Sequence, residues 1–155
     1  MAENKAQAAV AIGSDTAASA NNAFAGGFKS VATADRSFAF GNATSAKGST
    51  STAIGNGTQT TGNGSIAAGF KSIANAENSI AAGHAARTEE NAKSSFSFGR
   101  ETKTNAEYQM AIGKYNTPDE EALFIVGNGT DMAGDGESAK TSNAFVVKEN
   151  GDAEL

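Results

Sequence analysis

The chain has 155 residues, a net charge of -5, 18 glycines, one proline and no cysteine. Leu, Ile, Val and Phe supply only 23 residues, about 15% of the chain against the roughly 20% that an ordinary globular core needs, whereas alanine supplies 32. These numbers exclude a disulfide framework and a cysteine nucleophile, and the lack of basic clusters argues against nucleic acid as a partner. The chain is therefore either disordered, or regular with a narrow core and surface shared between chains.

A four-residue pattern of an apolar residue, alanine, an apolar residue and glycine recurs from residue 8 to residue 113. Its first copy is Val10-Ala11-Ile12-Gly13. The closing glycines are 14 residues apart, except for one interval of 16 residues, and they are Gly13, Gly27, Gly41, Gly55, Gly69, Gly83, Gly99 and Gly113. A fixed period of this kind argues against disorder and indicates a solenoid of stacked units.

The second half of each unit is also patterned. A serine or threonine stands three residues after most of the glycines, and small residues follow at alternate positions, as in Ser30, Ala32 and Ala34. Period two is typical of a strand with one buried face. We therefore expect two short strands in each unit, one that ends at the glycine and one centred five residues later. Eight such coils, stacked at about 4.8 Å per layer, would form a roll over residues 1–116.

The two faces of the first strand carry different side chains. We assign its large side chains to the roll core, namely Val10, Ile12, Phe24, Phe38, Phe40, Ile54, Ile66, Ile80, Phe96, Phe98, Met110 and Ile112. The residue between them is Ser97 in one unit and alanine in the others: Ala11, Ala25, Ala39, Ala53, Ala67, Ala81 and Ala111. A solvent-facing position would vary toward polar residues, so we predict that these alanines contact another chain in a symmetric oligomer.

The tetrads, the Gly-x-x-[Ser/Thr]-x-Ala-x-[Ala/Gly] continuation and the period of 14 resemble the head repeats of YadA-type trimeric adhesins over residues 8–116. The resemblance implies an all-β, left-handed parallel β-roll, a homotrimer, and attachment to a host-cell receptor, a glycan or matrix protein. It implies an extracellular location, either on a bacterial surface or on a virion, because the same roll occurs in phage tail fibres. It implies neither an enzyme nor a cofactor.

The 16-residue interval marks an irregular turn over residues 84–95, the most charged stretch of the repeats. His84, Arg87, Glu89, Glu90 and Lys93 stand in this turn. Two extra residues should bulge outward, so these five are the candidate receptor contacts. The alternative is a plain solvated turn. His84 is the only histidine, and nothing in its surroundings indicates a catalytic triad.

Residues 117–155 depart from the repeat. A polar breaker with the only proline precedes an expected strand over residues 122–127, and a second strand is expected over residues 143–147. We interpret this segment as a strand-rich neck or cap, and its sequence resembles a segment that follows such rolls in phage and prophage fibres. Asp131, Asp135 and Glu137 lack the alternating spacing of a calcium loop, so we expect no metal site, although ion binding by this loop stays open.

The sequence thus predicts a non-enzymatic, trimeric attachment-fibre module. One alternative is a purely structural spacer that holds another domain away from a surface. A less favoured alternative is a tail-spike glycan hydrolase, whose carboxylate pair would have to come from the turns. The longest apolar runs have five residues, far below the ~20 that cross a bilayer, so we expect no membrane insertion by this segment. The receptor, and the choice between adhesin and phage fibre, stay open.

Overall fold

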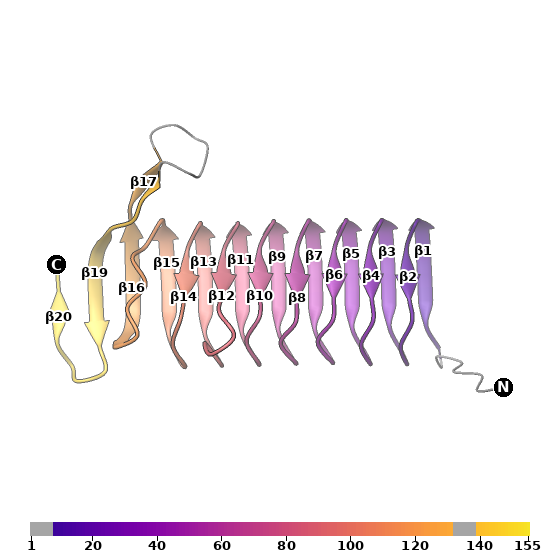
Figure 1. Ribbon diagram of the computed structural model, residues 1–155, viewed down its shortest axis with the longest axis horizontal. Coiled ribbons are helices and arrows are strands. Elements are labelled where there is room, and N and C mark those ends of the chain that lie inside the picture. The colour runs from indigo at the N-terminus through magenta and orange to yellow at the C-terminus, as the bar shows by residue number, and fades with distance from the viewer. Residues whose placement is uncertain (1–7, 132–138) are drawn as a thin grey trace.

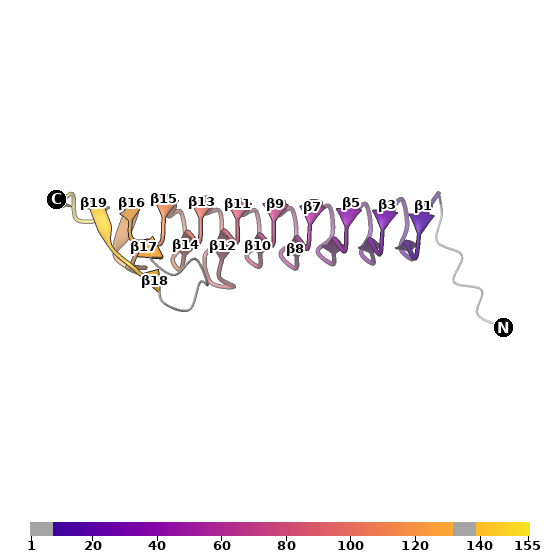
Figure 2. The same ribbon diagram turned by 90° about the horizontal axis from the view of Figure 1, so that it is seen from above.

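The structure is a computed structural model that describes residues 8–131 and 139–155, and every regular element in these ranges is a β-strand. Figure 1 shows a straight rod in which the coils stack side by side, with β1 and β20 at opposite ends. Figure 2 shows that the rod is thin, with the longer strands in one layer and the shorter strands in the other. The predicted all-β, parallel β-solenoid is confirmed. No helix in the described part of the chain could cross a membrane.

Each coil contains one five-residue strand followed by one two-residue strand, except that no short strand follows the last of the five-residue strands. The long strands are β1 (Val10–Ser14), β3 (Phe24–Phe28), β5 (Phe38–Asn42), β7 (Thr52–Asn56), β9 (Ile66–Phe70), β11 (Ile80–His84), β13 (Phe96–Arg100) and β15 (Met110–Lys114). The short strands are β2 (Ala17–Ala18), β4 (Val31–Ala32), β6 (Ser45–Ala46), β8 (Gln59–Thr60), β10 (Ile73–Ala74), β12 (Arg87–Thr88) and β14 (Lys103–Thr104).

The long strands pair in parallel in chain order, and the short strands do the same in a second, seven-stranded sheet. Equivalent residues of successive coils pair with each other, so that Gly41 is registered with Gly55 and Gly55 with Gly69. The 16-residue interval leaves this register intact, because Gly83 still pairs with Gly99. The two extra residues lie between β12 and β13, where the turn bulges at the lower edge of Figure 1.

The interior of the roll is made of alanine, serine and threonine, which corrects the assignment of the two faces of the long strands. Ala25, Ala39 and Ala53 are fully buried within the single chain, as are Ala67, Ala81, Ser97 and Ala111. None of the twelve large side chains assigned to the core is buried, and Phe40 and Ile54 are 49% and 42% exposed. The reason is steric, because two sheets this close leave room only for a methyl or hydroxyl group on each inner face.

Several buried hydroxyl groups in this narrow interior pair with each other across the roll, whereas the buried Thr58 Oγ1 has no hydrogen-bond partner. Ser51 Oγ and Thr60 Oγ1 lie 2.7 Å apart, and the same pair recurs as Ser79 with Thr88 at 2.8 Å. Where the short strand offers alanine instead, the serine donates to a carbonyl, as Ser65 does to Gly62 O at 2.7 Å. These bonds satisfy polar groups whose burial would otherwise cost about 1–3 kcal/mol each. The predicted burial in the short-strand half is confirmed for Ser30 and Ala32 and for their equivalents in the later coils, whereas Ala34 at the third position is only partly buried.

The second sheet ends at β14 for reasons that the sequence makes clear. The next short strand would fall at Thr117-Pro118, where proline has no N–H to donate. The side chain of Asn116 takes its place: its Oδ1 accepts from Lys103 N at 2.7 Å and its Nδ2 donates to Lys103 O at 2.9 Å. One amide side chain thus supplies the hydrogen bonds of a missing strand.

The first sheet continues past this point. β16 (Ala122–Asn128) pairs in parallel with β15, and Gly127 is registered with Gly113. β19 (Asn143–Lys148) and β20 (Ala153–Glu154) then add antiparallel strands, and β17 (Thr130–Asp131) pairs with β18 (Ala139–Lys140) in a separate small hairpin. The sheet therefore runs across the expected boundary between residues 116 and 117.

Replacing Asn116 with aspartate should destabilise this end of the roll by about 1–3 kcal/mol, because a carboxylate accepts from Lys103 N but cannot donate to Lys103 O. The measurement is the melting temperature together with hydrogen exchange at the amides of β14. Asn143→Asp is the matched control, since Asn143 makes the same double contact with Thr117 N and O in an exposed setting. Equal losses in both variants would contradict the role given to Asn116.

Candidate interaction surface

The outer face of the long-strand sheet carries a continuous row of large apolar side chains, which we call the apolar ladder. It consists of the twelve residues that the sequence placed in the core, which stack in register along the rod. Ile12 is 60% exposed, and Phe96, Phe98 and Met110 are 36–39% exposed. Soluble monomers seldom expose a contiguous apolar surface of this extent, so the apolar ladder is the foremost candidate for contact with another chain.

Aromatic rings stack on one another near the two ends of the apolar ladder. The rings of Phe24 and Phe38 stack at 4.9 Å between centroids, and those of Phe96 and Phe98 at 6.3 Å. Gly26 is the one glycine at an outward position of the tetrads, and the ring of Phe40 covers it, because a Cβ at Gly26 would come within 2.7 Å of that ring. The departure of Gly26 from the repeat therefore makes room for Phe40.

The apolar surface extends onto the C-terminal strands. Phe124 and Val126 of β16 follow Met110 and Ile112 in register, and β19 pairs Val147 and Phe145 with them. On the inner side of β16, Ile125 stands where the repeats have alanine, and it is fully buried beside Val146. The larger side chain fits because no short strand of the second sheet lies opposite this layer.

The five predicted receptor contacts do not form one group. His84 ends β11 at the edge where the long strands turn into the short ones, and its ring stacks on Phe70 at 5.0 Å between centroids. Arg87 belongs to β12, where its Nε lies 3.1 Å from the carboxylate of Glu89. Glu90 and Lys93 lie in the bulged turn at the opposite edge. The structure thus places Glu89, Glu90 and Lys93 in the bulged turn and separates His84, at the other edge, from them.

A half-hidden polar cluster lies beside the last coil. The hydroxyl of Tyr115 donates to Asp131 Oδ2 at 3.2 Å, and the guanidinium of Arg100 lies over the Tyr115 ring and 3.7 Å from the same carboxylate. Burial and then the hydrogen bond to Asp131 raise the pKa of the Tyr115 hydroxyl. These contacts fix the β17–β18 hairpin to the roll.

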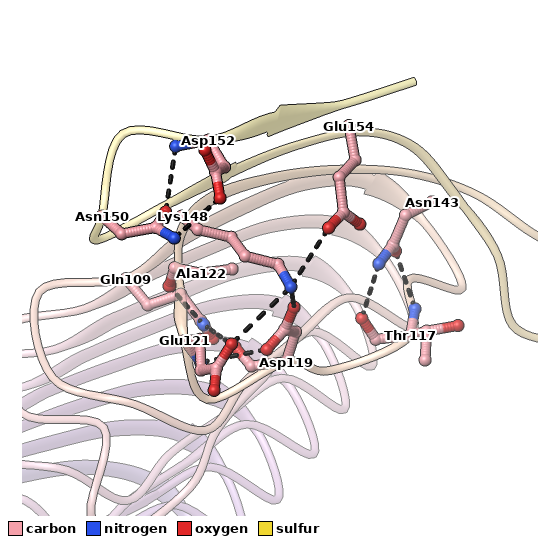
Figure 3. A network of polar contacts seen from close by, with 10 residues as sticks. All are labelled: Gln109, Thr117, Asp119, Glu121, Ala122, Asn143, Lys148, Asn150, Asp152 and Glu154. Atoms are coloured by element: carbon pink, nitrogen blue, oxygen red, sulfur yellow. Dashed lines mark hydrogen bonds and ion pairs between the residues drawn. The ribbon is translucent and has the colours of Figure 1, made fainter.

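Figure 3 shows a second polar network, which joins the end of the roll to the C-terminal strands. Lys148 Nζ lies 3.1 Å from Glu154, 3.6 Å from Glu121 and 3.8 Å from Asp119. The hydrogen bond to Glu154, together with its charge, raises the pKa of Lys148. Gln109, fully buried, donates to Asp119 O and Ala122 O at 2.6 and 2.8 Å and thus anchors the breaker segment to the last coil.

The surface has several open hollows. One of about 610 Å³ lies beside this network and is lined by Asn105, Pro118 and Asn143 among others. No group of metal-ligating side chains is present among the residues that the structure describes. Asp131 is described, whereas Asp135 and Glu137 of the acidic loop lie outside the described residues.

These observations define a class of protein, a parallel β-solenoid with a small-residue interior and an apolar sheet face open to other chains. The family model described as YadA head domain repeat (2 copies) matches residues 5–30, 27–44, 32–58, 46–72 and 61–86, which together span more than half of the chain. The chain therefore belongs to the YadA head family, a family of non-enzymatic adhesins on bacterial surfaces. Neither a curated protein nor a solved structure matches the chain.

Proposed function

We propose that this chain is a homotrimeric attachment module in which the apolar ladder of each protomer packs against the other two. The observation that carries the proposal is the exposure of this ladder on a chain whose interior is already complete without it. Adhesins of the YadA type are trimeric and bind host surfaces. Burial of these side chains, at ~25 cal/mol per Å², would give the assembly the apolar core that the single chain lacks.

The hydrogen bonding of the first sheet favours association through its face rather than through its backbone. Along most of the rod the backbone donors and acceptors of each long strand are already paired with the strands before and after it. Contact with another chain must therefore use side chains, and the outward side chains of this sheet are apolar. The opposite face of the roll offers mainly polar and charged residues such as Gln59, Arg87 and Lys103, which suit solvent or a ligand.

We further propose that residues 117–155 close the end of the roll. Support comes from Asn116, which completes the hydrogen bonds of β14, and from Ile125, which fills the layer that has no second sheet. An uncovered terminal layer would be an aggregation-prone edge. In this arrangement the cap also extends the apolar surface through Phe124 and Phe145, so that trimer contacts continue past the last coil.

Light scattering tests the assembly. The purified chain should have three times the 15.5 kDa mass of one protomer. Phe40→Asn combined with Phe98→Asn should yield monomers that keep their β circular dichroism, because both side chains point away from the interior. A monomeric wild-type chain would overturn the proposal, as would a double variant that stays trimeric with an unchanged melting temperature.

Binding to cells and to immobilised glycans and matrix proteins tests the attachment role. A trimer engages a multivalent surface with an avidity about 10²–10⁴ above that of a single site, so the monomeric double variant should lose at least tenfold in apparent affinity. A stable trimer that binds none of these surfaces would instead favour the structural spacer.

A further inference from the structure

Three basic side chains lie close together on one side of the roll, although the chain as a whole carries a net charge of -5. Lys71, Arg87 and Lys103 line a hollow of about 240 Å³, which we call the basic groove. It runs along β10, β12 and β14, which are neighbours in the second sheet (Figure 1). Ile73, Ala85, Glu101 and Thr102 complete its lining. The apolar ladder lies on the other sheet, so the basic groove stays accessible in the trimer proposed above.

The solenoid sets the spacing of these cations. Arg87 and Lys103 occupy the same position of neighbouring short strands and pair in register. Lys71 stands one coil earlier, in the turn that leads to Ile73, which is registered with Arg87. Successive coils are about 4.8 Å apart, so the three charges step along the fibre axis. A second hollow of about 250 Å³ shares Glu101 and Lys103 and leads on past Tyr115.

Contacts within the chain hold the charges in place while leaving them exposed. Glu89 Oε1 lies 3.1 Å from Arg87 Nε and 3.7 Å from Lys103 Nζ, and these two side chains are 42% and 46% exposed. Lys71 Nζ lies over the ring of Phe70 at 5.2 Å from its centroid. Exposed ion pairs contribute only ~0–1 kcal/mol to stability. These contacts therefore add little to folding, and the three cations stay accessible to a ligand.

We propose that the basic groove binds a linear anionic polysaccharide that lies along the fibre axis. The inference rests on the proposed attachment function and names the ligand class. Sulfate or carboxylate groups of the polysaccharide would pair with Lys71, Arg87 and Lys103, as anions do with such side chains. Sugar hydroxyl groups would donate to the Glu101 carboxylate. A nucleic acid is a poorer fit, because a pI of 4.8 is far from the basic character of nucleic-acid-binding domains.

The test uses the full chain and heparin, a linear sulfated polysaccharide, with affinities measured at 50 and 200 mM salt. Wild type should bind, and its affinity should fall roughly twentyfold to fortyfold over this range if three cations release counterions as they do on nucleic acids. The triple variant Lys71→Gln, Arg87→Gln, Lys103→Gln should lose at least tenfold in affinity at 50 mM salt. Its trimer mass and melting temperature should be unchanged.

Arg36→Gln, Lys47→Gln, Lys93→Gln is the matched control, because it removes the same charge from turns on the opposite edge. It should keep the affinity of wild type for heparin. Equal losses in both triple variants would overturn the basic groove as a site, and single-stranded DNA that binds as tightly as heparin would overturn the polysaccharide assignment. A trimer that adheres to cells but ignores heparin would overturn this inference alone and leave the attachment function in place.

Discussion

Ala53→Glu should unfold the middle of the roll, whereas Ile54→Glu, one residue further on, should leave the coils intact and abolish assembly. Ala53 is fully buried between Ala39 and Ala67 of the neighbouring coils. A carboxylate there is desolvated without a cationic partner, which costs several kcal/mol, and its extra volume adds about 1–3 kcal/mol of overpacking. Ile54 is 42% exposed on the apolar ladder, so its replacement costs the single chain little.

Circular dichroism melting and light scattering on both variants check this contrast. A second pair of variants at the same two positions separates the effect on folding from the effect on assembly. Ala53→Val should lower the melting temperature clearly, and Ile54→Val should change it little. If Ala53→Glu folds normally and only the trimer is lost, the alanines face a partner chain after all, and the interior described above is wrong.

Gly55→Ala should be among the most disruptive single-methyl changes in the chain, with a loss of about 4 kcal/mol or more. Gly55 has a φ of +127°, and a Cβ there would lie 2.0 Å from the carbonyl oxygen of Gly69 in the next coil. The neighbouring coil would have to move away, and the hydrogen bonds between layers would break with it. The glycine column is thus required by contact between coils as well as by backbone conformation.

Gly57→Ala is the control for this prediction. Its φ is +67° and a Cβ there would meet only the Lys71 side chain, at 3.5 Å. Ala43 and Ala85 already occupy the equivalent turn position with φ of 53°, so the loss should stay near the 1–2 kcal/mol of a left-handed alanine. Urea unfolding of both variants gives the comparison, and similar losses would contradict the steric argument.

The period of 14 was enough to predict the fold, because each glycine, hydroxylic residue and small residue recurs at a fixed place. The orientation of the long strands was not predictable in the same way. Alternation distinguishes two faces but does not say which one is inside, and the usual preference for burying the larger side chains led to the wrong choice. The width of the interior decides the matter, since it admits Ala39 but excludes Phe40.

The sequence carries signals for two other features that the tetrad pattern alone does not predict. Gly127 follows Gly113 by 14 residues, so the period already indicated that β16 continues the first sheet. Arg87 and Lys103 occupy the same repeat position four residues after their glycines, which indicates a row of charge along the rod. The pairing of Asn116 with Lys103 had no such signal, because it depends on a side chain replacing a strand in space.

The bulged turn over residues 89–95 marks a place where the repeat accommodates extra residues. Two residues have been added there, and the register resumes at Gly99 without a shift. The column of repeat glycines from Gly13 to Gly113 offers no such freedom, because a Cβ at any of them would clash with a carbonyl oxygen of the next coil. New sequence can therefore enter at the edge of the bulged turn without altering the register of the coils that carry it. In the trimer proposed above, a foreign peptide inserted at this edge would be displayed three times.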